Sequence, residues 1–167
     1  AQFRSWWSLC RNNVPKECLM PFNRNYINHV FPEKKVEVEK GRLAFFSKTI
    51  GETNPIYFDE MAAHDKGHPS LLVPPTFLFS LSIEGETFTE KYGPLGRDLS
   101  KLLHGAQDFN YYGSAYAGDH LTFQAKIIDI FSKKDGALDF LIEETTVKNQ
   151  NGSHIATLKQ TYIMREG

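Results

Sequence analysis

The chain has 167 residues, with 19 basic and 20 acidic side chains and a formal net charge of -1. A chain of this length is expected to form one domain with its own core. Because neither sign of charge forms a long block, the composition argues against a nucleic-acid or membrane-surface partner and favours small molecules or proteins.

Two cysteines, Cys10 and Cys18, lie near the N-terminus. A disulfide framework or a zinc site needs more such residues at suitable spacing, so we expect a reducing, cytoplasmic setting. The apolar runs are far shorter than the roughly 20 residues of a membrane span, and no continuous apolar segment resembles a signal peptide.

Residues 2–12 combine apolar side chains at mixed helical spacing, and Pro15 ends that pattern. We expect a short helix there, within an N-terminal extension over residues 1–24. Trp6 and Trp7 are large for an exposed tail, so we expect them to pack on the domain or on a neighbouring subunit and not on a ligand.

The first regular elements follow from a change in periodicity. Residues 34–39 alternate charged and apolar side chains, which predicts a strand with one solvated face. Leu43, Phe46 and Ile50 are then separated by three and four positions. This spacing predicts an amphipathic helix that ends at Gly51.

A turn and a buried helix come next. Asn54-Pro55 predicts a turn, and Asp59 is a candidate cap for a helical turn that ends near His64. After Pro74-Pro75, residues 77–83 are apolar on nearly every side, which predicts a helix buried in most directions.

The rest of the chain is rich in strand patterns. We expect a loop or short helix over residues 85–100 and then four extended segments, at residues 107–112, 121–131, 137–149 and 154–165. Turns at Lys134-Asp135-Gly136 and Asn149-Gln150-Asn151-Gly152 join the last three, because these residues accept a positive φ. The predicted class is α+β, with helices on one face of an antiparallel sheet.

Several motifs occur in a characteristic order. Residues 46–59 read Phe-x-x-x-x-Gly-[acid]-x-Asn-Pro-Ile-[aromatic]-x-Asp, and Pro-Pro-Thr-Phe opens the buried helix. Residues 103–109 and 117–121 supply two further motifs. Over residues 25–165 this order resembles the MaoC-like hydratase/dehydratase branch of the hot-dog superfamily, and most closely its N-terminal, fungal-type fatty-acid-synthase dehydratase variety.

The resemblance implies a single hot-dog domain over residues 1–167, with a five-stranded antiparallel sheet wrapped around the buried helix. It implies hydration of an enoyl thioester, or dehydration of a 3-hydroxyacyl thioester, of coenzyme A or acyl carrier protein, with no cofactor. It also implies pairing through sheet edges, as a homodimer or as a heterodimer with a catalytic hot-dog subunit.

Active members of this family carry an Asp and a His, five positions apart, as the acid/base pair. This chain has Glu52 and Tyr57 in those positions. The longer Glu side chain displaces its carboxylate, and a Tyr with a pKa near 10 is a donor and a poor base at neutral pH. Such a chain resembles subunits that shape the acyl tunnel while a partner supplies the pair. Alternatively, Glu52 is simply solvated and Tyr57 is a core aromatic.

Four further residues are candidates for the site. His104 could replace the missing imidazole, or could instead bond to the last carbonyls of a helical turn. Asn54 could contact substrate or make an Asx turn. Because Pro74-Pro75 has no N–H, the first donors for a thioester oxygen at the helix start are Thr76 and Phe77.

A metal site and a thioesterase activity are two further possibilities. His64 and His68 are four positions apart, but Gly67 and Pro69 interrupt the helix that a two-His site needs, so no metal is expected. A hot-dog acyl-CoA thioesterase needs a carboxylate on the buried helix. Glu84 is the only acid near that helix, and it lies toward the wrong end.

Overall fold

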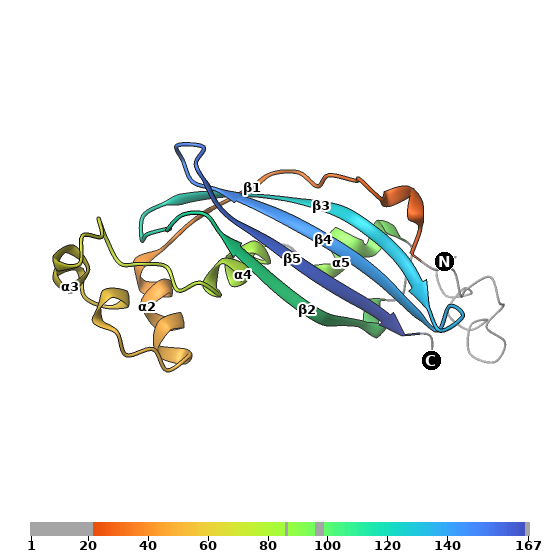
Figure 1. The fold of residues 1–167 in the computed structure, drawn as a ribbon, viewed down its shortest axis with the longest axis horizontal. Helices are drawn as coiled ribbons and strands as arrows, with labels where there is room; N and C mark the ends of the chain where they lie inside the picture. Colours follow the sequence, from red (N-terminus) through yellow and green to blue (C-terminus); the bar gives the residue numbers. More distant parts are fainter. Residues whose placement is uncertain (1–21, 86, 96–98, 166–167) are drawn as a thin grey trace, which may run out of the picture.

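The computed structural model describes residues 22–85, 87–95 and 99–165. The predicted helix over residues 2–12, with Trp6, Trp7 and both cysteines, lies outside these ranges. Figure 1 shows one long, curved sheet with short helices packed against it and a helical lobe at one end.

The sheet has five antiparallel strands in the order β1-β3-β4-β5-β2. The strands are β1 (Lys34–Glu37), β2 (Leu102–Tyr111), β3 (His120–Lys133), β4 (Leu138–Lys148) and β5 (His154–Arg165). The predicted fold class and strand number are therefore confirmed.

One strand boundary was predicted wrongly. β2 begins at Leu102 and not at Gln107, because residues from Leu102 onward pair with β5 before the register shifts between His104 and Ala106. Gly105 lies at that irregularity, and a Cβ there would come within 2.5 Å of the side chain of Ile163. The irregularity breaks the alternation that marks a strand in sequence.

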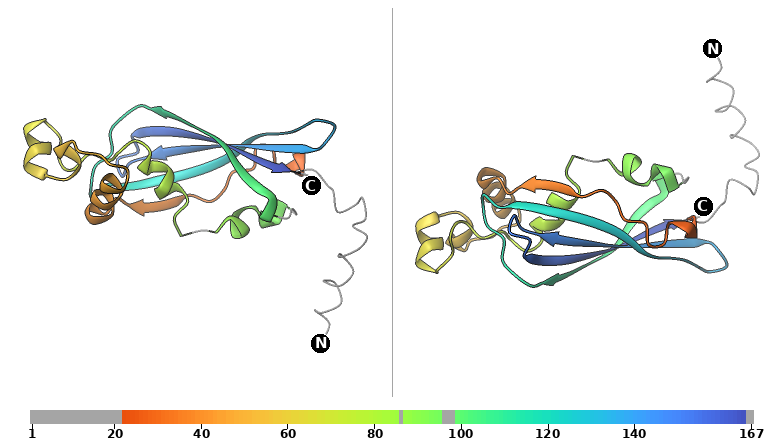
Figure 2. Two further views of the ribbon diagram at one scale, coloured as in Figure 1. Left: turned by 90° about the horizontal axis from the view of Figure 1, so that it is seen from below. Right: turned by 90° about the horizontal axis from the view of Figure 1, so that it is seen from above.

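The α-helices are α2 (Lys40–Thr49), α3 (Glu60–Asp65), α4 (Phe77–Ser82) and α5 (Phe88–Tyr92), and the 3-10 turns are η2 (Arg24–Tyr26), η3 (Pro55–Tyr57), η4 (Gly93–Leu95) and η5 (Leu99–Lys101). Figure 2 shows α4 and α5 on the same side of the sheet, with α2 and α3 at one end of it. A capping box between Thr87 and Glu90 starts α5, within the segment predicted as loop or short helix.

α4 is held by packing, because a helix of this length is not stable alone. Phe77, Leu78 and Leu81 are buried in one apolar cluster with side chains of β3, β4 and β5. Burying three such side chains contributes roughly 5–9 kcal/mol. The prediction of a buried helix holds for this face only, since Phe79 is half-buried and Ile83 is 42% exposed at the C-cap.

The buried face of the amphipathic helix before Gly51 also contains fewer of the predicted residues. Leu43 is fully buried, Phe46 is half-buried, and Ile50 is 51% exposed because it is the C-cap and not part of the packed face. Ser47 is buried instead, and its hydroxyl donates to the Leu43 carbonyl at 2.9 Å.

A second apolar cluster lies under α5 and includes Tyr92, Leu141, Tyr162 and Met164.

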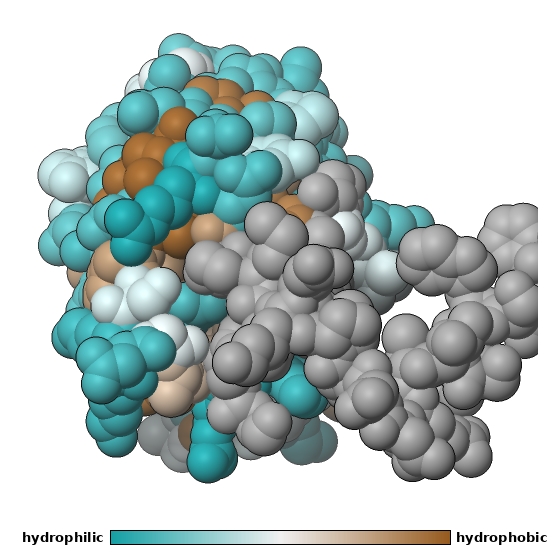
Figure 3. Space-filling model, turned by 90° about the vertical axis from the view of Figure 1, so that its right-hand side faces the viewer, coloured by the Kyte–Doolittle hydropathy of each residue, from teal (hydrophilic) through white to brown (hydrophobic). Residues whose placement is uncertain are grey.

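The end of the molecule seen in Figure 3 is mainly hydrophilic, with apolar residues gathered in one band. On the inner face of the sheet Asp139 is buried and accepts from the Ser132 hydroxyl, and three further buried polar side chains belong to neither apolar cluster: Glu143, Thr145 and Gln160. We call these three residues the polar belt.

Candidate functional site

The motif turn is built on the end of α2. Gly51 adopts a φ of 76°, a conformation that a residue with a side chain rarely adopts. Its N–H donates to Lys48 O at 3.1 Å, and the N–H of Glu52 donates to Ser47 O at 3.0 Å. These bonds satisfy the last carbonyls of the helix and fix the direction in which Glu52 leaves it.

The Glu52 carboxylate bonds to its own turn. Its Oε1 accepts from the N–H of Asn54 at 2.9 Å and from the N–H of Thr53 at 2.8 Å. These two bonds lower the pKa of Glu52, with the bond from Asn54 contributing most. A carboxylate stabilised in this way stays ionised and is a weak base.

Asn54 serves the same turn. Its side-chain oxygen accepts from the N–H of Ile56 at 3.3 Å and caps η3. The carboxylate of Asp59 accepts from the N–H of Ala62 at 3.0 Å and caps α3, which confirms the predicted cap.

Tyr57 lines a hollow of about 160 Å³ between this turn, the start of α4 and the end of β2. Burial, together with the nearby charge of Glu52, raises the pKa of Tyr57, so its hydroxyl remains a neutral donor. All residues around this Tyr57 hollow are uncharged: Tyr57, Leu72, Val73, Pro75, Leu78, Tyr111, Gly113, Ser114, Ala115 and Ile155.

The start of α4 offers fewer free hydrogen-bond donors for a ligand than expected from the first turn of a helix. The N–H of Phe77 donates to the carbonyl of Pro74 at 3.0 Å, and its ring packs on Phe46 with centroids 4.7 Å apart. Thr76 is exposed at the N-cap, and its side chain makes no capping bond. Neither residue lines the Tyr57 hollow.

His104 lies elsewhere. It stacks on Phe79 with ring centroids 5.1 Å apart and lines a different hollow, of about 270 Å³, with Phe88 and Tyr162. Tyr111, on the same strand, borders the Tyr57 hollow. The strand rise of about 3.3 Å per residue separates the two positions by roughly 20 Å. The structure thus joins Glu52 to Tyr57 in one turn but does not bring His104 to them.

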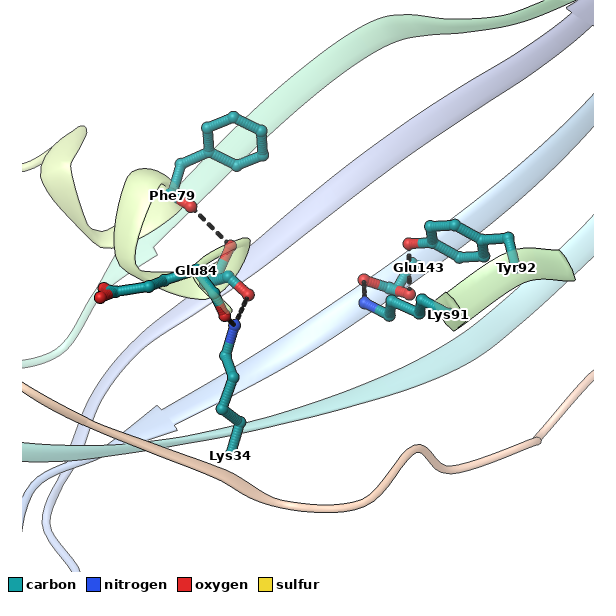
Figure 4. Close-up of polar contacts among 7 residues, drawn as sticks. Lys34, Phe79, Glu84, Lys91, Tyr92 and Glu143 are labelled. Atoms are coloured by element: carbon teal, nitrogen blue, oxygen red, sulfur yellow. Dashed lines mark hydrogen bonds and ion pairs between the residues drawn. The ribbon is translucent and has the colours of Figure 1, made fainter. Parts of the chain in front are cut away.

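The polar belt holds a buried ion pair that the motifs did not indicate. Glu143 is 1% exposed, and its carboxylate accepts from Lys91 Nζ at 2.7 Å and from Tyr92 Oη at 2.8 Å (Figure 4). Burial first, and then the charge of Glu143, raise the pKa of Tyr92 above its usual range. The alternation Leu141-x-Glu143-x-Thr145-x-Val147 in the sequence could have placed Glu143 on the inner face.

The other end of α4 is held by Lys34 of β1. Its Nζ donates to the carbonyls of Ser82 and Glu84, which terminate the helix (Figure 4). The carboxylate of Glu84 accepts from Arg42 of α2 at 2.5 Å. Glu84 is therefore an ion-pair partner of α2 and does not line the Tyr57 hollow.

Within the residues that the structure describes, no three His, Cys, Asp or Glu side chains gather as metal ligands would. The Nε2 atom of His64 lies 3.0 Å from Pro69 O, and the Nδ1 atom of His68 lies 3.5 Å from the Tyr116 hydroxyl.

No helix in the described ranges is both long enough and apolar enough to span a bilayer.

Comparisons with known proteins place this geometry in context. Residues 25–158 match the family model described as FAS1-like, dehydratase domain region. The chain is 34% identical over 134 residues to a UPF0336 protein of Streptomyces coelicolor, covering 80% of this chain and 88% of that one. It is 31% identical over 148 residues to a UPF0336 protein of Thermobifida fusca, covering 87% and 95%.

Similar folds occur among solved structures. A chain of the C-terminally truncated HadBC (3R-hydroxyacyl-ACP dehydratase) complex of Mycobacterium tuberculosis aligns with a TM-score of 0.69 at 18% identity, over 83% of this chain and 96% of that one. The R-hydratase PhaJ1 of Pseudomonas aeruginosa aligns with a TM-score of 0.63 at 14% identity, over 84% and 83%.

Proposed function

Since this chain belongs to the FAS1-like dehydratase-domain family and has its MaoC-like hot-dog fold, we propose that it is the acyl-thioester-binding subunit of a heteromeric hydratase/dehydratase. Its ligand is an enoyl or 3-hydroxyacyl thioester of coenzyme A or acyl carrier protein. The catalytic acid/base pair is supplied by a second hot-dog chain.

One observation carries the proposal: the hollow at the family motif is lined entirely by uncharged residues, while the nearby carboxylate of Glu52 is bound to its own turn. Adding water to an enoyl thioester requires a base for the water and an acid for the α-carbon. Glu52 has a lowered pKa and Tyr57 a raised one, so neither is adjusted for proton transfer near neutral pH.

The same hollow is suited to binding. Its wall is mostly apolar, which favours a hydrocarbon chain, and the hydroxyl of Tyr57 can donate to a ligand oxygen. In this proposal Glu52 and Asn54 shape the turn that carries Tyr57. Thr76 follows Pro75 of the hollow wall and remains the candidate donor for a thioester oxygen at the edge of the hollow, whereas the N–H of Phe77 would first have to leave Pro74.

In this proposal the partner binds along β2. β2 is an edge strand of the sheet, and its side chains Leu103 and Tyr111 are 49% and 44% exposed. An unpaired edge with exposed apolar groups readily adds another strand. We therefore place the catalytic chain against β2, in line with the complex that the name of the similar HadBC structure describes.

The direct test compares the purified chain with the chain co-expressed with a hot-dog protein that carries Gly-Asp-x-Asn-Pro-x-His. Loss of the enoyl absorbance of crotonyl-CoA reports hydration. We expect activity from the pair and none from the chain alone. Turnover by the chain alone that Glu52→Gln abolishes would instead make Glu52 the general base.

The thioesterase alternative is tested in the same samples by following release of free coenzyme A thiol. We expect no release, because the carboxylate of Glu84 is paired with Arg42. Release that disappears in Glu84→Gln would reverse this assignment.

A further inference from the structure

A small cavity lies beside the polar belt, on the α5 side of α4. It has a volume of about 40 Å³ and is bounded by the C-terminal end of α4, by α5 and by the inner face of the sheet. Its wall includes Ile83, Phe88 and Phe123, with Thr145 and Gln160 from the belt. Lys34 and Lys91 also line it, but their ammonium groups are bonded to the carbonyls of Ser82 and Glu84 and to the carboxylate of Glu143. We call it the Gln160 cavity.

Gln160 is the unusual member of this wall. It is 1% exposed, and its Oε1 atom has no hydrogen-bond partner among the residues that the structure describes. Its neighbour across the strands, Glu143, is fully engaged with Lys91 and Tyr92. A buried acceptor without a donor is costly, so this oxygen is suited to a ligand that brings one.

We propose that the Gln160 cavity recognises a hydroxyl group near the far end of the bound acyl chain. This inference rests on the proposed function, since it assumes that the chain binds an acyl thioester. It adds a substrate class: oxygenated acyl chains in preference to plain hydrocarbon ones.

A hydroxyl fits for two reasons. It both donates and accepts, so it can pair with the Gln160 amide in either orientation of that group. The cavity of about 40 Å³ has room for roughly three water molecules, which suits the end of a chain and not a head group.

The position of α4 connects the two sites. Leu78 borders the Tyr57 hollow, and Ser82 and Ile83 border the Gln160 cavity. At a rise of 1.5 Å per residue these positions are roughly 6–8 Å apart along the helix. A chain that runs beside α4 from a thioester at the Tyr57 hollow therefore approaches the polar belt within a few carbon atoms.

The test uses the full chain and isothermal titration calorimetry with saturated acyl-CoA thioesters of increasing length, each with and without a terminal hydroxyl. At the length that reaches the cavity, we expect the hydroxylated thioester to bind roughly 3- to 10-fold more tightly, the range of one net hydrogen bond. Gln160→Leu should abolish that preference and leave binding of the plain thioester unchanged or stronger.

Gln107→Leu is the matched control, because Gln107 also has a buried oxygen without a partner in the described part of the chain but lines none of the hollows described above. Gln160→Met provides an unbranched second variant, and melting temperatures establish that each variant is folded. A wild-type protein that binds both thioesters equally at every length, or a preference that survives in both Gln160 variants, overturns the inference alone. Failure of every acyl-CoA to bind overturns the proposed function and this inference with it.

Discussion

The carboxylates near the two ends of α4 lie in opposite surroundings. At the N-terminal end, the carboxylate of Glu52 is only half-buried and is bound by the N–H groups of its own turn. At the C-terminal end, Glu143 is buried and joins the sheet to α5 through Lys91 and Tyr92. Electrostatic interactions strengthen with burial. We therefore expect loss of the charge at the C-terminal end, which lacks the family motif, to lower the free energy of unfolding more than loss of the charge at the N-terminal end.

The largest expected effect comes from breaking the buried pair. Glu143→Leu leaves the Lys91 ammonium and the Tyr92 hydroxyl without their acceptor, and we expect the free energy of unfolding to fall by about 3 kcal/mol. This is the low end of the usual range, because the Lys91 side chain is 17% exposed and can reach some water. Urea denaturation measures the loss.

A matched control and a rescue sharpen this test. Glu144→Leu changes the neighbouring residue, which is half-buried on the other face, and we expect a change within about 0.5 kcal/mol. Adding Lys91→Met to Glu143→Leu should restore at least part of the loss, because no unpaired charge then remains. Equal losses of unfolding free energy in Glu143→Leu and Glu144→Leu would contradict the proposed difference between the two faces of β4.

The same buried cluster predicts sensitivity to alkali. Tyr92 and Tyr162 have pKa values raised by burial, whereas the unfolded chain ionises its tyrosines near pH 10. Above that pH the folded state therefore binds more protons than the unfolded state, and stability falls as pH rises. The expected slope is about 1.4 kcal/mol per pH unit for each tyrosine.

Tyr92→Phe should remove one tyrosine's share of this slope, as measured by urea denaturation between about pH 9 and pH 11. Tyr112→Phe is the control, since Tyr112 is 62% exposed and should leave the slope unchanged. An identical slope in the wild type and in Tyr92→Phe would show that Tyr92 ionises as easily folded as unfolded.

An intermediate effect is expected at the sheet edge. Leu103→Lys places a charge on β2, where we propose that the catalytic chain binds, and should weaken association by about 1–2 kcal/mol, or roughly 5- to 30-fold in Kd. Sedimentation measures the association. Phe45→Lys alters a side chain that is 73% exposed on α2 and should leave Kd unchanged. The opposite ranking would move the interface to α2.

The smallest effect is expected at the motif itself. In the active complex, Glu52→Gln should change kcat/KM by less than about twofold, because the Gln oxygen can still accept from the two N–H groups of the turn. Replacing the catalytic Asp of the partner by Asn serves as the positive control. A large drop in the Glu52 variant would place proton transfer in this chain.

Much of the fold followed from local pattern. The alternation in β3, β4 and β5 placed these strands to within two residues, and the turn at Lys134-Asp135-Gly136 has the positive φ values that its residues indicate. The start of β2 did not follow, because pairing with β5 across the irregularity at Gly105 decides it. The site could be predicted only in part. The motif grouped Glu52, Asn54 and Tyr57, but it did not indicate the residues that surround them.

The sequence by itself determined most of the elements, the succession of β3, β4 and β5 and the motif turn, because each depends on residues a few positions apart. The tertiary structure alone decided that His104 stacks on Phe79 and lies outside the Tyr57 hollow, and that Glu143 meets Lys91 across 52 positions of chain. Contacts of that kind depend on how a curved sheet closes over its helices. No local periodicity encodes that closure.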